Sequence, residues 1–173
     1  MARTRLPFRQ VNRAGLPGHD PELQRHHLLP RQLVSRKMFG AMFGAIGVCP
    51  VRLDDFRENG MLLPANEMAA ARSRLPLHRG PHRQYSVMVA ERVSQVELRW
   101  LATRRREPAQ AACDARQQLA LLQRALRLQL LLAQPYPIVR NRKDPLRAGR
   151  DFAQLDDMAE KLWSATDISS PSD

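Results

Sequence analysis

Two long stretches of the chain repeat apolar side chains at the spacing of an α-helix. In residues 81–106 the apolar positions recur every three or four residues: Val89, Val93, Val96 and Trp100. Residues 109–133 carry a second stripe: Ala115, Leu119, Leu122, Leu126 and Leu130. This spacing places the apolar side chains on one face of a helix, where they can pack into a core. Since only Glu107 and Pro108 separate the two stretches, they are predicted to form an antiparallel helical hairpin.

The first half of the chain has shorter elements, separated by proline, glycine and asparagine. Four are predicted from apolar runs: strands over residues 23–29 and 61–64, and helices over residues 31–47 and 67–74. The apolar face of the first of these helices is expected to contain Leu33, Val34, Met38, Met42 and Ile46. Residues 53–58 are predicted to form one helical turn, with Asn59-Gly60 as its stop or as a tight turn. Asn66 is expected to be the N-cap of the helix over residues 67–74.

The two ends of the chain differ from its middle. Prolines and glycines break any regular pattern in residues 1–22, which are predicted to form a basic arm and loops. Residues 152–165 are predicted to form a last helix, with Asp151 as its N-cap. The 173 residues are therefore expected to fold as one compact, predominantly helical α+β protein. Its parts are the arm, a core over residues 23–106, and a helical C-terminal extension over residues 107–173 with an acidic tail.

The charge of the chain is basic and unevenly distributed. Residues 1–150 hold 27 basic and 11 acidic side chains, a net of +16, whereas residues 151–173 hold one basic and six acidic ones. All but three of the basic residues are arginine, whose guanidinium makes two-point contacts with phosphate. A polyanionic partner, most simply nucleic acid, is expected, and a solvated arginine-rich surface is the alternative.

Cysteine content and hydropathy exclude several classes of protein. Cys49 and Cys113 are too few for a disulfide framework or a four-cysteine zinc site, so buried thiols in a reducing compartment are expected. The longest weakly polar run, residues 38–51, is shorter than the roughly 20 residues that span a bilayer. No apolar segment typical of a secretory leader follows the basic N-terminal residues. The sequence thus predicts a cytoplasmic protein without membrane contact.

Four histidines are candidates for metal binding or catalysis. His26 and His27 are adjacent on the first predicted strand, and His78 and His82 are spaced i, i+4. Pro81 suits the first position of a helix, which puts His78 in the loop before the helix and His82 in its first turn. Imidazoles bind zinc, nickel or manganese, and a neutral histidine can act as a base near pH 7. The two pairs could therefore form a hydrolytic metal centre or a structural metal site.

Three segments resemble the AHH nuclease family of the HNH/endonuclease VII, or His-Me finger, superfamily. They are residues 24–30, 58–64 and 77–85, with the sequences QRHHLLP, ENGMLLP and LHRGPHRQY. The family pattern is an adjacent histidine pair, an asparagine-glycine element that ends in leucine-proline, and His-x-Gly-x-His-x-x-Tyr. The resemblance covers residues 14–93, about half the chain. One departure is visible, because Arg25 stands where the family has the alanine of its name.

The resemblance implies a ββα-metal core, with the histidine pair on its first strand, and a one-metal hydrolysis of phosphodiester bonds. His27 would be the general base that takes a proton from water. One divalent ion (Mg²⁺, Mn²⁺, Ni²⁺ or Zn²⁺) would stabilise the phosphate and the leaving 3′ oxygen, held by His26, His78 and His82. Asn59 would orient the loop that positions the base, or contact the metal. Tyr85 would support the site by packing or by a hydrogen bond.

The implied substrate is DNA, with RNA as the alternative. Arg25, Arg79 and Arg83 flank the histidines and are expected to contact phosphate, although exposed arginines are as often simply solvated. His19 is expected to be non-catalytic. Because members of the family often serve as toxins, an effector role with an immunity protein as partner is a further possibility.

A different class of function is also compatible with the sequence. The protein would then be a non-enzymatic module that binds nucleic acid or protein, with histidines that hold a structural metal. The two hypotheses differ in what metal removal does. A structural metal should leave the apo protein unfolded, whereas a catalytic one need not.

Overall fold

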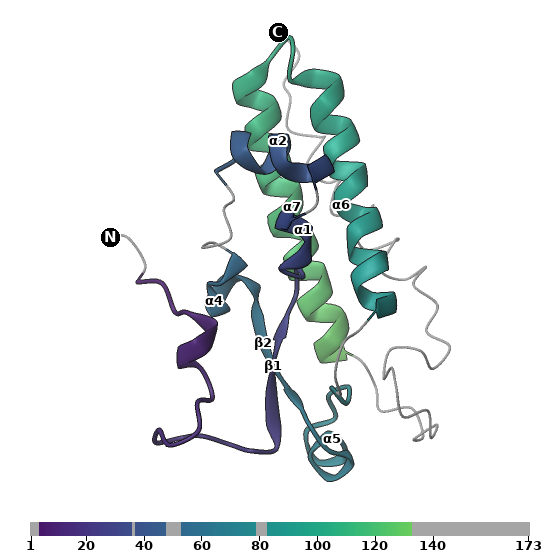
Figure 1. Ribbon diagram of the computed structural model, residues 1–173. Coiled ribbons are helices and arrows are strands. Elements are labelled where there is room, and N and C mark those ends of the chain that lie inside the picture. Colours follow the sequence, from purple (N-terminus) through teal and green to yellow (C-terminus); the bar gives the residue numbers. More distant parts are fainter. Residues whose placement is uncertain (1–3, 36, 48–52, 79–82, 133–173) are drawn as a thin grey trace, which may run out of the picture.

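The computed structural model describes residues 4–35, 37–47, 53–78 and 83–132 (Figure 1). Several predicted features lie outside these residues: the helix of residues 152–165, the acidic tail, and Cys49.

Helices dominate the described residues. In chain order the elements are η1 (Phe8–Gln10), β1 (Leu23–His27), α1 (Gln32–Ser35), α2 (Lys37–Ala45), α4 (Phe56–Asn59), β2 (Gly60–Pro64), α5 (Glu67–Ser73), α6 (Arg83–Thr103) and α7 (Pro108–Leu132). The two strands pair as one antiparallel sheet. The predicted class, α+β and predominantly helical, is confirmed.

Helices α6 and α7 lie side by side as the predicted hairpin (Figure 1). The stripe residues of both helices are buried, and Val93 and Leu126 are inaccessible to solvent. Pro108 is the first residue of α7. Proline suits this position, because the N–H that it lacks would make no hydrogen bond within the helix. No helix within the described ranges has the length and apolar character needed to cross a membrane.

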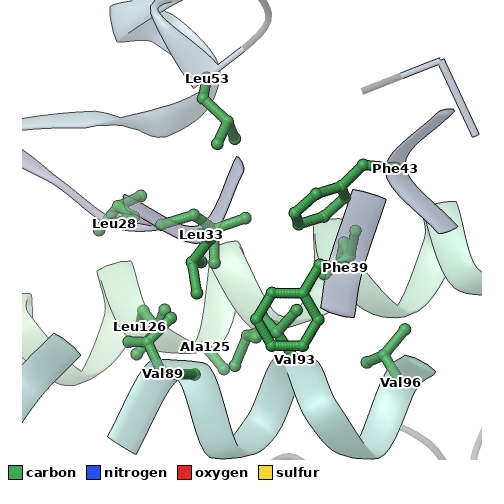
Figure 2. Close-up of a cluster of buried hydrophobic side chains, with 14 of the residues drawn as sticks. Leu28, Leu33, Phe39, Phe43, Leu53, Val89, Val93, Val96, Ala125 and Leu126 are labelled. Atoms are coloured by element: carbon green, nitrogen blue, oxygen red, sulfur yellow. The ribbon is translucent and has the colours of Figure 1, made fainter. Parts of the chain in front are cut away.

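Helices α1 and α2 fall within the predicted helix of residues 31–47, and α2 packs against the α6–α7 hairpin. Phe39 of α2 lies against Val93 of α6, and Phe43 points toward Leu33 in the same buried cluster (Figure 2). The prediction that Met38 lies on the buried face is wrong, since 53% of its surface is exposed. On a helical wheel Met38 lies about 90° from the centre of the buried face. That face consists of Phe39, Met42, Phe43 and Ile46.

Cys113 is exposed, so the prediction of a buried thiol is wrong for this residue. Its neighbours Ala111 and Ala115, two positions away on either side, are buried on the stripe of α7. A helix turns by about 100° per residue, so Cys113 points about 200° away from them, toward solvent.

The β1–β2 sheet is anchored to the helical core at one end. Its register runs from Leu23 opposite Pro64 to His27 opposite Gly60. Leu28, the residue directly after β1, is fully buried among the core side chains (Figure 2). The end of the strand that carries the histidine pair is therefore held by the core.

Gly60, at the start of β2, is a position where a side chain does not fit. A Cβ there would lie 2.6 Å from the backbone oxygen of Phe56, and closer still to the Phe56 ring. Gly60→Ala is expected to destabilise the protein by about 3 kcal/mol, since backbone must move to make room. Gly44→Ala is the control, because nothing lies within 4 Å of a Cβ at that exposed helical position. It should stabilise the protein by about 0.5–1 kcal/mol. Urea denaturation measures both. Equal stabilities of the two variants would contradict the conclusion that a side chain does not fit at Gly60.

Candidate functional site

Strand β1 directs its two histidines to opposite sides of the sheet. Successive side chains on a strand alternate between its faces. On one face, the ring of His26 contacts the rings of His78 and Tyr85. On the other face, the ring of His27 stacks on Phe8. The adjacent pair therefore occupies two different environments.

His26 is almost completely buried, with 4% of its surface exposed. Its ring centroid lies 5.1 Å from that of His78 and 4.9 Å from that of Tyr85, with both pairs edge to face. The Tyr85 hydroxyl donates a 2.6 Å hydrogen bond to the backbone oxygen of Leu28. Burial raises the pKa of Tyr85, so the hydroxyl keeps its proton. Tyr85 thus ties the first turn of α6 to the residue that follows the histidine pair.

His78 is held through both its backbone and its ring. Its backbone N–H donates a 2.7 Å hydrogen bond to the oxygen of Pro64, at the end of β2. Its Nδ1 lies 3.0 Å from Oε1 of Gln24, on β1. Because a carboxamide oxygen only accepts hydrogen bonds, this contact puts the ring proton on Nδ1 and the lone pair on Nε2. Such a hydrogen bond from the second ring nitrogen is typical of imidazoles that ligate metal ions.

The separation of His26 and His78 fits two ligands of one metal ion. Metal–nitrogen bonds of about 2.1 Å at a tetrahedral angle put two ligating ring centroids about 5 Å apart, and the observed separation is 5.1 Å. Among the residues that the structure describes, no group of three or more His, Cys, Asp and Glu side chains could hold an ion. The predicted third ligand, His82, lies outside those residues. His26 and His78 are thus the described part of the candidate metal centre.

His27 lies in a largely apolar environment. Its ring is parallel to that of Phe8 at a centroid distance of 3.6 Å, and Phe8 packs edge-on against Phe56 at 5.0 Å. Within the described part of the chain, its Nε2 is buried and has no hydrogen-bond partner. Burial lowers the pKa of His27 from 6.5 to about 4; the charge of Arg31 adds to this effect, and that of Asp54 opposes it. The imidazole is therefore neutral at neutral pH, the form that can accept a proton.

The segment that carries Phe8 is docked on the residues ahead of β2. The Phe8 N–H donates to the backbone oxygen of Asp54 at 3.2 Å, and the Phe56 N–H donates to that of Leu6 at 2.8 Å. Arg25 adds a 2.8 Å hydrogen bond from Nη1 to the backbone oxygen of Phe8. Arg5 and Asp54 form an ion pair at 2.7 Å. Part of the predicted arm is therefore hydrogen-bonded to the rest of the protein and contacts His27 through Phe8.

Phe8→Ala is expected to raise the pKa of His27 from about 4 toward 6.5, because burial is the main cause of the lowered pKa. The unfolded wild-type chain binds this proton at a higher pH than the folded protein does. Wild-type stability should therefore fall as the pH drops from 6.5 to about 4, and the variant should lose less in that window. NMR titration of the His27 ring measures the pKa. Phe8→Leu, which keeps an apolar cover, should stay nearer the wild type, and an unchanged pKa in Phe8→Ala would argue against Phe8 as the cover.

Asn59 is fully buried, and its whole carboxamide is engaged. Oδ1 accepts hydrogen bonds from the Leu29 N–H at 2.7 Å and from Nε2 of Gln123 at 3.1 Å. Nδ2 donates to the backbone oxygens of Leu29 at 2.9 Å and Leu53 at 3.0 Å. The backbone oxygen of Asn59 also accepts from the Leu28 N–H at 2.9 Å. These bonds occupy the two donor and two acceptor positions of the carboxamide and fix the two residues after the histidine pair.

Two of the three predicted phosphate-binding arginines are described, and both are exposed. Arg25 lies on β1 and Arg83 begins α6, whereas Arg79 lies outside the described residues. A hollow of about 290 Å³ lies beside β1 and is lined by Asn12, His19, Pro21, Leu23, Gln24 and Arg25. The strand that carries the histidine pair is thus bordered by a polar, partly cationic surface.

No sequence pattern predicts the contacts of Phe8 and Gln123. Phe8 is a single aromatic residue among prolines and arginines, far ahead of His27 in the chain. Gln123 lies beside the leucine stripe of α7, 64 residues after Asn59. Only the folded chain brings either side chain to the site.

A protein-family model matches residues 7–126, and it is described as a nuclease family of the HNH/ENDO VII superfamily with conserved AHH. The match spans the region from η1 through most of α7, including both strands and Asn59 at the end of α4. The adjacent histidine pair within it is His26-His27, preceded by Arg25. No curated protein and no solved structure shows a significant match to the chain.

Proposed function

Since the chain belongs to the AHH family of nucleases in the HNH/ENDO VII superfamily, we propose that it is a metal-dependent endonuclease that cleaves DNA. One observation carries this proposal, the division of the histidine pair between two faces of β1. His26 lies edge-on to His78, and neutral His27 lies on the other face. Consecutive residues of one strand can thereby supply a metal-binding face and a base.

In this proposal β1, β2 and the first turn of α6 form a ββα-metal core. The two strands are antiparallel, and α6 follows β2 after the short helix α5. Tyr85 of α6 is hydrogen-bonded to the residue after β1, which supports this arrangement. The divalent ion would be Mg²⁺, Mn²⁺, Ni²⁺ or Zn²⁺, held by His26, His78 and His82. When bound, the ion supplies positive charge that stabilises the phosphate and the leaving 3′ oxygen.

His27 is the proposed general base. Its neutral imidazole accepts a proton from the attacking water, while Phe8 holds the ring from one side. Asn59 positions the base through its hydrogen bonds to Leu28 and Leu29 and does not touch the reacting atoms. Since Nε2 of His27 is buried among the described residues, we expect substrate binding to expose this atom to water.

The proposed nucleic-acid contacts are made by arginines around the site. Arg25 and Arg83 are exposed near the histidines, and Arg79 follows His78 in the sequence. The net charge of +16 over residues 1–150 supports a polyanionic substrate. Because bound cations leave the nucleic acid at each phosphate contact, affinity should fall steeply with salt concentration.

The proposal is tested by incubating purified protein with supercoiled plasmid, single-stranded DNA and RNA in each of the four metals. We expect plasmid cleavage with at least one metal and none in EDTA. Cleavage of RNA alone would contradict DNA as the substrate but would support nuclease activity. Binding without cleavage in every metal would contradict the proposal and favour a non-enzymatic binding module.

A further inference from the structure

Helix α7 contacts the corner between α4 and β2 through an arginine. Nη2 of Arg127 lies 3.0 Å from the backbone oxygen of Arg57, 3.2 Å from that of Glu58 and 3.1 Å from that of Gly60. The last carbonyl groups of a helix have no partner within the helix. In α4, which has four residues, a cationic side chain from another helix supplies that partner.

Gln123, four residues earlier on α7, reaches the residue that lies between these carbonyl groups. Its Nε2 donates a 3.1 Å hydrogen bond to Oδ1 of Asn59, the atom that also accepts the Leu29 N–H. Residues spaced i, i+4 share one face of a helix, so Gln123 and Arg127 approach the corner together. One face of α7 thus holds the backbone on both sides of Asn59 and the carboxamide itself.

We propose that Gln123 and Arg127 are positioning residues of the nuclease site, an inference that rests on the proposed function. Gln123 contacts Asn59 directly, and Arg127 contacts the backbone on both sides of it. Asn59 in turn contacts Leu29, two residues after His27. Helix α7 then has a role besides packing on α6, because it determines where the end of β1 lies. Arg127 lies just beyond the residues that the family model matches.

Kinetics of an Arg127 series tests this role. Arg127→Ala is expected to lower kcat by about 10- to 100-fold with little change in KM, because the base is displaced while the phosphate contacts remain. Arg127→Lys should keep most of kcat, since one ammonium group can donate three hydrogen bonds. The matched control is Arg124→Ala, which removes the same charge from an exposed position of α7 and should leave kcat unchanged. Wild-type kcat in Arg127→Ala would overturn the proposal.

Amide hydrogen exchange at Leu29 tests the positioning without reference to cleavage. The Leu29 N–H is bound by Asn59, so a loosened corner should make it exchange faster. We expect at least a tenfold faster exchange at Leu29 in Arg127→Ala and in Gln123→Met, with the Val93 amide of α6 unchanged. Gln123→Met keeps the side-chain length and covers the case in which Arg127→Ala does not fold.

Two failures can then be told apart. If the wild-type protein cleaves nothing, the proposed function fails, and the Leu29 exchange rates still decide whether α7 holds the corner. If the wild type cleaves but Leu29 exchanges at the wild-type rate in both variants, the positioning role of Gln123 and Arg127 is overturned.

Discussion

Replacing His27 with alanine is expected to lower the rate of DNA cleavage by about 10²- to 10⁴-fold, the usual contribution of a general base. The variant loses the imidazole that takes the proton from water. His26 and His78 lie on the opposite face of β1, so the affinity for the divalent ion should change little. Single-turnover cleavage at saturating metal measures the rate, and isothermal titration calorimetry measures metal affinity.

His19→Ala is the matched control for this experiment. His19 is exposed and is not one of the proposed catalytic or metal-binding residues, so the variant should cleave at nearly the wild-type rate. Nucleic-acid affinity should be retained in both variants. If His27→Ala folds, binds the ion and cleaves as fast as the wild type, His27 is not the base.

Asn59→Ala is expected to lower the free energy of unfolding by about 3–5 kcal/mol. The change leaves the Leu29 N–H and the backbone oxygens of Leu29 and Leu53 without their partner. Each such buried group costs about 1–3 kcal/mol when it is unpaired. Since domains are stable by only about 5–15 kcal/mol, the variant should be close to unfolding at 37 °C. Urea denaturation followed by circular dichroism measures the change.

Asn66→Ala provides the comparison, because it removes the same side chain from a partly exposed position, where the side chain also donates a 3.2 Å hydrogen bond to Glu22. Asn66 accepts a 2.8 Å hydrogen bond from the Ala69 N–H as the N-cap of α5. Loss of such a cap costs about 1 kcal/mol. Equal losses of stability in Asn59→Ala and Asn66→Ala would contradict the view that Asn59 joins separate segments of the site.

Features that one segment determines by itself could be predicted from the sequence. The stripes of α6 and α7 define buried faces whatever helix lies opposite, and both helices are confirmed to within a few residues. The N-cap at Asn66 is also confirmed, because capping involves only the next three residues. The predicted strands lie close to the observed bounds, since short apolar runs bounded by turn residues are typical of strands.

It is harder to predict from the sequence which side of a helix packs against the core. Met38 and Cys113 belong to residue types that are usually buried, yet both face solvent. Phe39 and Phe43 were absent from the predicted apolar face of α2 but fill the space over α6. The deciding factor is the orientation of each helix on the core, which no local pattern contains.

The candidate site shows the same division. The sequence marks His26, His27 and Asn59, because they lie in the segments that resemble the AHH nuclease family. It does not mark their partners, since Phe8, Leu53 and Gln123 come from three separate segments. Strand alternation alone puts the two histidines on different faces, but the stack on Phe8 and the approach of His78 arise only from tertiary packing.

The central claim is that this chain is a nuclease whose activity depends on a divalent ion. The most direct measurement is plasmid cleavage by one preparation of wild-type protein, assayed with the ion, after EDTA, and after the ion is restored. We predict cleavage in the first assay, none in the second and recovery in the third. Cleavage that persists in EDTA, or no cleavage with any divalent ion, would contradict the claim.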